Sequence, residues 1–186
     1  MSVISHDLNF IYIRVPRTGS TTFLHHLESA VDTKQVGGQH ESAIEARFTW
    51  HHRWDSSLTF GFIRNPWDWL VSVYNANLST TAGEPELHPG ALIEPHDAPG
   101  IHPGQRMNAT FDEWVRQRKT FPADWLYDGD ERIVKQVWLF EDLIQRTSVI
   151  KSDMPHSPYQ EWYTPELVDF VAEKCKREIE VGKYEF

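Results

Sequence analysis

The stretch that decides the fold runs from Asn9 to Leu27 and reads NFIYIRVPRTGSTTFLHHL. Its first part, Asn9–Val15, is rich in aromatic and β-branched residues, which favours a buried β-strand. Pro16–Thr22 follows with a proline, a glycine and small hydroxyl residues, which is typical of a turn. Apolar residues then recur at helical spacing from Phe23 onward. The sequence therefore predicts a strand, a tight loop and a helix in succession.

Strand-like and helix-like segments alternate along the rest of the chain. Further strands are predicted at Leu58–Ile63 and Ile133–Phe140. Helices are predicted at Ser42–Trp50, from Pro66 onward, at Phe111–Lys119 and at Pro165–Ile179. This alternation favours the α/β class, with a parallel sheet covered by helices on both faces. Ligands of such sheets bind at the carboxyl ends of the strands.

The composition is that of one ordinary globular domain. The chain has 186 residues, of which 40% are hydrophobic, so it can bury a sizeable core. Its net charge of −9 disfavours a broad nucleic-acid-binding surface. The lone Cys175 excludes an intrachain disulfide and a cysteine metal cluster. Neither a leader-like start at Met1–Asn9 nor an apolar run of ~20 residues is found, so we expect no membrane segment and a cytoplasmic location.

The loop Pro16–Thr22 has the chemistry of a phosphate loop. Gly19 allows the backbone to turn, and the N–H groups that follow point out of a helix N-terminus, where they attract an anion. Ser20, Thr21 and Thr22 add hydroxyl donors, and Arg17 adds a cation. The common nucleotide-binding pattern G-x-x-x-x-G-K-[ST] is absent. The alternative is a Ser/Thr-rich helix cap without a ligand.

A second candidate segment, Arg64–Asp68 (RNPWD), follows the strand predicted at Leu58–Ile63. Pro66 suits the first turn of a new helix, and Ser72 lies two turns into it. Arg64 and Ser72 could converge on one anionic group. The alternative is that Arg64 pairs with Asp68 and that Ser72 faces solvent.

Together the two segments resemble the sulfotransferases that use 3'-phosphoadenosine-5'-phosphosulfate (PAPS). Members carry a P-[KR]-x-G-[ST]-[ST] loop and an R-[ND]-P-x-[DE]-x-x-x-S-x-Y segment, which match Pro16–Thr22 and Arg64–Tyr74. Val137–Leu143 (VWLFEDL) is similar to a further element of the family. The end of the chain, from Tyr163–Leu167 (YTPEL) through Gly182–Phe186 (GKYEF), resembles the closing helix and tail of the carbohydrate-type branch.

The resemblance implies a three-layer α/β/α, P-loop-like fold with a central parallel sheet, formed by residues 1–186 as a single domain. It implies transfer of a sulfuryl group from PAPS to an acceptor hydroxyl or amine, with 3'-phosphoadenosine-5'-phosphate (PAP) as product and no metal. The carbohydrate-type likeness favours a glycan acceptor, while the acceptor's identity and the oligomeric state stay open. The implied donor-binding residues are Arg17, Thr18, Gly19, Ser20, Thr21 and Thr22 for the 5'-phosphosulfate, and Arg64 and Ser72 for the 3'-phosphate.

Many family members have Lys at the position of Arg17. Lys can donate a proton to the leaving phosphate, whereas Arg stays charged and stabilises it electrostatically. Arg17 is therefore a predicted catalytic residue but not a general acid.

The acceptor must also lose a proton, so a base is expected. His40 lies between the two motifs, just before a predicted helix, and the carbohydrate-type branch is similar in placing a histidine base in this interval. Glu41 is the alternative base, because other branches use Glu. A third possibility is that neither acts and that His40 only caps the helix or lies in solvent.

The segment from Ser79 to Gln105 is rich in Pro, Gly and His and is either an acceptor-binding lid or a poorly ordered excursion. Two other classes compete with the sulfotransferase hypothesis. One is a P-loop kinase or nucleotide-binding protein, and the other is a PAP-binding domain without activity.

Overall fold

The computed structural model describes residues 2–37, 40–81, 109–146 and 156–186. The chain divides into two compact units, which are described one at a time. The first consists of Met1–Arg64 and Pro122–Ser152, and the second of Asn65–Phe121 and Asp153–Phe186.

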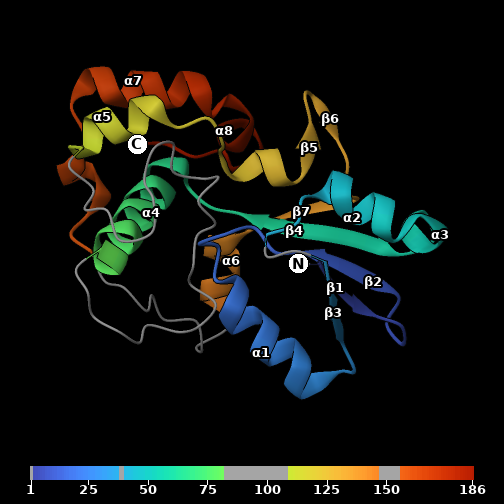
Figure 1. Ribbon diagram of the computed structural model, residues 1–186. Coiled ribbons are helices and arrows are strands. Elements are labelled where there is room, and N and C mark those ends of the chain that lie inside the picture. The colour runs from blue at the N-terminus through green and yellow to red at the C-terminus, as the bar shows by residue number, and fades with distance from the viewer. Residues whose placement is uncertain (1, 38–39, 82–108, 147–155) are drawn as a thin grey trace. The chain divides into compact units, whose positions relative to one another are not determined.

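A five-stranded sheet with strand order β3-β1-β2-β4-β7 forms the centre of the first unit (Figure 1). The strands are β1 (Ser2–Ser5), β2 (Phe10–Ile13), β3 (Lys34–Val36), β4 (Leu58–Ile63) and β7 (Gln136–Leu139). β4 pairs in parallel with both β2 and β7, whereas β1 is antiparallel to β2 and β3. The predicted α/β class is therefore confirmed, and the predicted parallel pairing holds for β2, β4 and β7, whereas β1 and β3 make the sheet a mixed one. The short strands β1 and β3 were not predicted, because three or four residues are too few to establish a period.

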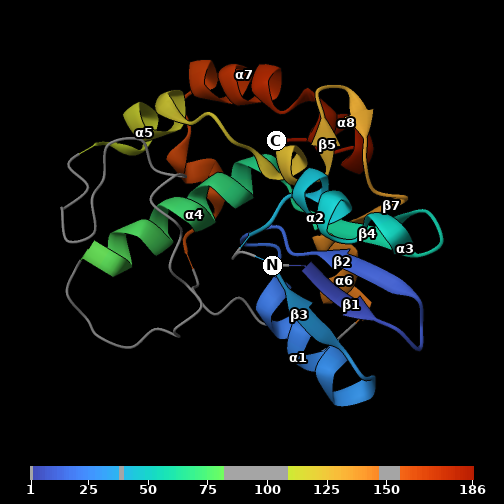
Figure 2. The same ribbon diagram turned by 45° about the vertical axis from the view of Figure 1, so that its right-hand side comes forward.

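Helices cover both faces of this sheet, as Figures 1 and 2 show. α1 (Ser20–Ala30) and α6 (Phe140–Arg146) lie on one face, where Leu24, Phe23, Leu27 and Leu143 pack against Val3, Phe10, Tyr12, Phe60 and Phe62. Side chains alternate across a strand, so Gly61 faces the other side. A Cβ atom on Gly61 would lie 2.4 Å from the Leu126 side chain. Glycine thus lets the segment after the 3-10 helix η2 (Pro122–Trp125) lie close to the sheet.

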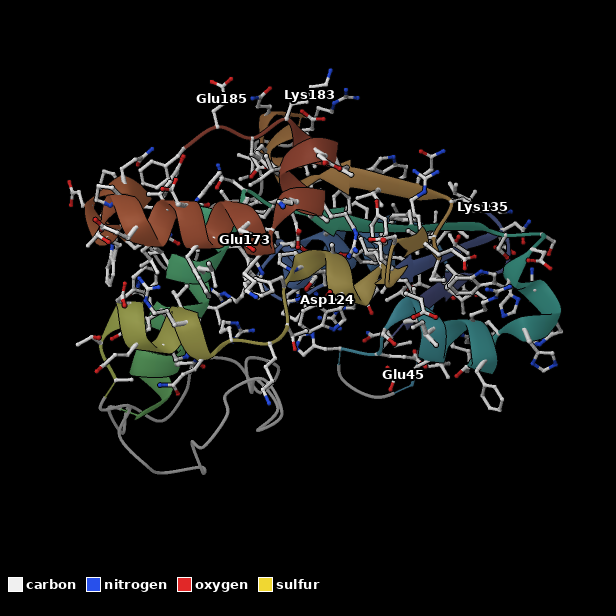
Figure 3. All side chains as sticks on the ribbon, turned by 90° about the horizontal axis from the view of Figure 1, so that it is seen from above. Glu45, Asp124, Lys135, Glu173, Lys183 and Glu185 are labelled. Atoms are coloured by element: carbon white, nitrogen blue, oxygen red, sulfur yellow. The ribbon has the colours of Figure 1, made fainter. Side chains whose placement is uncertain are left out.

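The face of the sheet opposite α1 and α6 also carries α2 (Ala43–Thr49) and the short α3 (His51–Trp54). A capping box starts α2, in which Ser42 and Glu45 exchange side-chain and backbone hydrogen bonds. Glu45 is labelled in Figure 3, together with Lys135, whose ammonium group donates to the Asp55 carbonyl at 2.7 Å. The hairpin of β5 (Tyr127–Asp128) and β6 (Glu131–Arg132) completes this unit.

The described part of the second unit is helical and consists of α4 (Pro66–Thr81), α5 (Phe111–Gln117), η3 (Tyr159–Trp162), α7 (Pro165–Lys174) and α8 (Lys176–Gly182). The helices predicted from Pro66 and at Phe111 are confirmed. The single C-terminal helix predicted at Pro165–Ile179 is wrong, because Cys175 leaves helical geometry at φ −105° and ψ 28°. Cys175 is buried with Leu167 and Val171, so the predicted apolar face is correct as far as this break.

The predicted irregular segment from Ser79 to Gln105 lies outside the described residues, except that α4 extends to Thr81. Among the described residues, no helix combines the length and the apolar character that crossing a membrane requires.

Candidate active site

The loop between β2 and α1 has the backbone geometry of an anion site. Gly19 is the N-cap of α1 and adopts the left-handed conformation, with φ 67° and ψ 17°. No side chain caps this helix, so no capping side chain accepts a hydrogen bond from its first N–H groups. The Thr18 hydroxyl donates to the Val15 carbonyl at 2.8 Å inside the protein and fixes the turn. The alternative of a Ser/Thr-capped helix therefore does not hold at Gly19.

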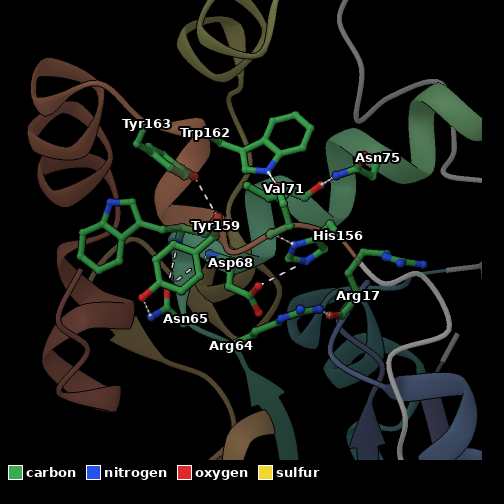
Figure 4. A network of polar contacts seen from close by, with 12 residues as sticks. Arg17, Arg64, Asn65, Asp68, Val71, Asn75, His156, Tyr159, Trp162 and Tyr163 are labelled. Atoms are coloured by element: carbon green, nitrogen blue, oxygen red, sulfur yellow. Dashed lines mark hydrogen bonds and ion pairs between the residues drawn. The ribbon is translucent and has the colours of Figure 1, made fainter.

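Arg64 links the second motif to this loop. Its Nη1 donates to the Arg17 carbonyl at 3.1 Å, as Figure 4 shows. The Arg64 guanidinium lies 4.9 Å from the centre of the Phe140 ring, and the residue is only 7% exposed. Arg17 has φ 58°, a conformation that costs a residue with a side chain about 1–2 kcal/mol. Arg64 therefore helps to hold a strained loop in place, a role that the sequence did not suggest.

His40 lies beside the carboxyl end of β2. Burial lowers the pKa of His40 to about 4, although a hydrogen bond with the Arg14 main chain opposes this shift. The ring is therefore neutral at pH 7. Its Nδ1 is buried and has no hydrogen-bond partner among the described residues. Trp125 Nε1 donates to the His40 carbonyl at 2.9 Å and so fixes the backbone of the predicted base.

Glu41, the alternative base, is held by structural contacts. Its carboxylate accepts hydrogen bonds from the Ser2 N–H and from the Thr49 hydroxyl, each at 3.1 Å. The residue is 7% exposed, and a Cβ atom at Gly37 would overlap its carboxylate. These contacts tie the start of β1 to α2 and occupy both oxygens, so the geometry favours His40 over Glu41.

Arg14 and Trp125 are neighbours of the site that sequence reasoning missed. Arg14 directly follows β2, and its Nη2 donates to Thr21 Oγ1 in the loop at 3.4 Å. The rule that strand ends carry functional side chains could have identified Arg14. Nothing near Trp125 in the sequence points to His40, which precedes it by 85 residues.

The start of α4 is built by side chains of the second unit. Asn65 Oδ1 accepts from the backbone N–H groups of Trp67 at 3.1 Å and Asp68 at 3.3 Å. Ser72 is 3% exposed, so the alternative of a solvent-facing serine is wrong. Asp68 lies 3.3 Å from His156 Nε2. Arg64 and Ser72 belong to different units, and their convergence on one phosphate stays a prediction.

Among the described residues, no group of three or more His, Cys, Asp or Glu side chains could hold a metal ion. Comparison with curated proteins and with solved structures gave no match. The model of the sulfotransferase family, in contrast, matches residues 1–156. That range includes the loop Pro16–Thr22, the segment Arg64–Tyr74 and His40. The chain therefore belongs to the sulfotransferase family.

Proposed function

We propose that this protein transfers a sulfuryl group from PAPS to an acceptor hydroxyl or amine and releases PAP. The observation that carries the proposal is the loop between β2 and α1. There an uncapped helix N-terminus, the left-handed Gly19 and the contact between Arg17 and Arg64 occur together. In this proposal, residues 1–186 form a single catalytic domain.

The donor's 5'-phosphosulfate would bind to the backbone N–H groups at the start of α1. The residues proposed to contact it are Arg17, Thr18, Gly19, Ser20, Thr21 and Thr22. A helix N-terminus carries a partial positive charge, which suits a doubly anionic group. The Thr18 hydroxyl already donates to Val15, so we expect Thr18 to contribute its backbone N–H. The 3'-phosphate would bind Arg64 and Ser72.

The chemical step is an in-line displacement at sulfur. The acceptor oxygen forms a bond to sulfur while the bond from sulfur to the bridging phosphate oxygen breaks. The electron pair of the broken bond stays on the 5'-phosphate of PAP, where Arg17 stabilises the new charge. The acceptor proton moves to His40, whose ring is neutral at pH 7 and can accept it, although burial makes this ring a weaker base than an ordinary histidine.

The acceptor group is proposed to be a hydroxyl or an amine, with a glycan favoured over other classes of acceptor. This preference rests on the likeness of the chain's last residues to the carbohydrate-type branch. A panel of sugars, tyrosine peptides and simple alcohols, each incubated with PAPS, would identify the acceptor class.

A thermal-shift titration with PAP, 5'-AMP and ATP with Mg²⁺ tests the donor. A ligand that binds only the native state at a hundredfold excess over Kd stabilises it by about 2.7 kcal/mol. We expect a clear shift with PAP and a smaller shift with 5'-AMP. A shift with ATP and Mg²⁺ but none with PAP would contradict the proposal and favour a kinase.

The base is tested by the variant His40→Ala. We expect this variant to lose turnover while its affinity for PAP stays within about threefold of wild type, because the ring contacts the acceptor and not the donor. Full activity of His40→Ala would refute the assignment, and Glu41→Gln would then be the next variant to assay.

A further inference from the structure

Three polar contacts from one later segment hold the first turn of α4 (Figure 4). His156 Nε2 lies 3.3 Å from the Asp68 carboxylate. Tyr159 accepts a hydrogen bond from Asn65 Nδ2 at 3.4 Å. The Tyr163 hydroxyl donates to the Trp67 carbonyl at 2.8 Å. Residues 156–163, which we name the clasp, therefore bind the turn that carries the second motif.

The contact between His156 and Asp68 is the strongest candidate of the three for a specific role. His156 Nδ1 lies 2.8 Å from the Ser157 carbonyl, while Nε2 faces a carboxylate. Both partners are acceptors, so each contact is made by a ring nitrogen that donates. The two side chains are 12% and 24% exposed, so water screens this pair less than it screens a surface pair.

Asp68 is part of a polar stripe on α4. Asn65, Asp68 and Ser72 are spaced three and four residues apart, which places them on one side of the helix. The neighbouring positions Trp67, Trp69, Leu70 and Val71 are buried apolar residues. The clasp thus acts on two members of the stripe, and the third member, Ser72, is the proposed ligand of the 3'-phosphate.

We propose that His156 and Tyr159 are positioning residues that set the orientation of the α4 stripe and thereby the enzyme's preference for a donor with a 3'-phosphate. This inference rests on the proposed function. His156 is the last residue of the family match, and Tyr159 lies beyond it. The discrimination would therefore depend partly on a segment outside the matched range.

The test compares the affinities of residues 1–186 for PAP and for 5'-AMP, two ligands that differ by the 3'-phosphate. The contact between His156 and Asp68 holds the turn that precedes Ser72, so we expect His156→Gln to weaken PAP binding about tenfold. Binding of 5'-AMP should change less than twofold. Tyr159→Phe removes one long hydrogen bond and should weaken PAP binding about threefold. His156→Lys, which again places an N–H donor opposite the Asp68 carboxylate, should recover part of the loss.

His25→Gln is the matched control, because His25 pairs with Glu28 at 3.7 Å on the exposed side of α1. It should bind both nucleotides as the wild type does. Circular dichroism and thermal unfolding show whether each variant is folded. If wild type prefers PAP and the folded variants prefer it equally, the inference is wrong while the proposed function stands. If wild type itself shows no preference for PAP, the proposed donor is wrong and the inference falls with it.

Discussion

The two motifs that both follow parallel strands are held in place in different ways. The loop Pro16–Thr22 is built largely from its own residues, with Gly19 in the left-handed region and Thr18 bonded to the carbonyl three residues before it. The start of α4 depends on Asn65 and on the clasp, which lies about 90 residues later in the chain. Mainly local contacts therefore specify the first motif, to which Arg64 adds one contact from 47 residues away, whereas long-range contacts specify the second. Substitutions in the two regions should differ in kind as well as in size.

The largest expected effect is that of Arg17→Ala on turnover. Removing one preorganised group that stabilises the leaving charge costs on the order of 10²–10³ in kcat. Affinity for PAP should fall much less, since the backbone N–H groups of the loop remain. Steady-state kinetics with saturating PAPS measure the difference.

Arg17→Lys is the control for this prediction. Lys keeps the positive charge and occurs at this position in many family members, so the variant should retain most of the activity. Equal losses in the two variants would show that the shape of the guanidinium matters more than its charge. Unchanged kcat in Arg17→Ala would contradict the catalytic role.

The next effect is the contribution of His40, which lies near the loop, to the pH dependence of the unfolding free energy. His40 has its pKa lowered to about 4 in the folded protein, against an ordinary value near 6.5. The unfolded chain therefore binds more protons between these values, and stability falls as the pH is lowered through that window. The loss attributable to His40 is about 3 kcal/mol at pH 4.

Urea unfolding of wild type and His40→Gln at several pH values isolates this contribution. The difference in unfolding free energy between the two proteins should be constant above pH 7 and should shift against wild type below pH 6.5. If the unfolding free energies of the two proteins change with pH in the same way down to pH 4, burial does not disfavour the charged ring of His40.

Local patterns in the sequence predict part of the structure, whereas contacts between distant residues are not visible in it. The segments at Asn9–Val15 and Leu58–Ile63 have strong strand patterns, and both strands are confirmed. The loop after β2 is predictable because glycine allows a tight turn and the residues after it begin a helix whose N–H groups can bind an anion. The contacts of Trp125 with His40 and of Tyr159 with Asn65 were not predictable, because each joins residues more than 80 positions apart.

Ser72→Ala gives a smaller effect that is confined to the second motif. The hydroxyl is proposed to donate to the 3'-phosphate, so its removal should weaken PAP binding about tenfold and leave 5'-AMP binding unchanged. Calorimetric titration of both nucleotides measures the two constants. Equal weakening for both would place Ser72 outside the 3'-phosphate site and would remove the functional difference between the motifs.

The smallest effect tests whether the first motif builds itself. Thr18→Val removes the hydrogen bond to the Val15 carbonyl in a fully buried turn and should lower the unfolding free energy by about 1–2 kcal/mol. Ser56→Ala is the control, because it removes a hydrogen bond of the same spacing, from Ser56 Oγ to the Arg53 carbonyl, at an exposed position. It should cost less than about 0.5 kcal/mol of unfolding free energy.

The affinity of Thr18→Val for PAP should fall no more than about threefold, because Arg64 still holds Arg17. A much larger loss of affinity, with stability unchanged, would mean that the Thr18 hydroxyl contacts the donor directly and that the loop, like the start of α4, takes its final shape from outside its own residues.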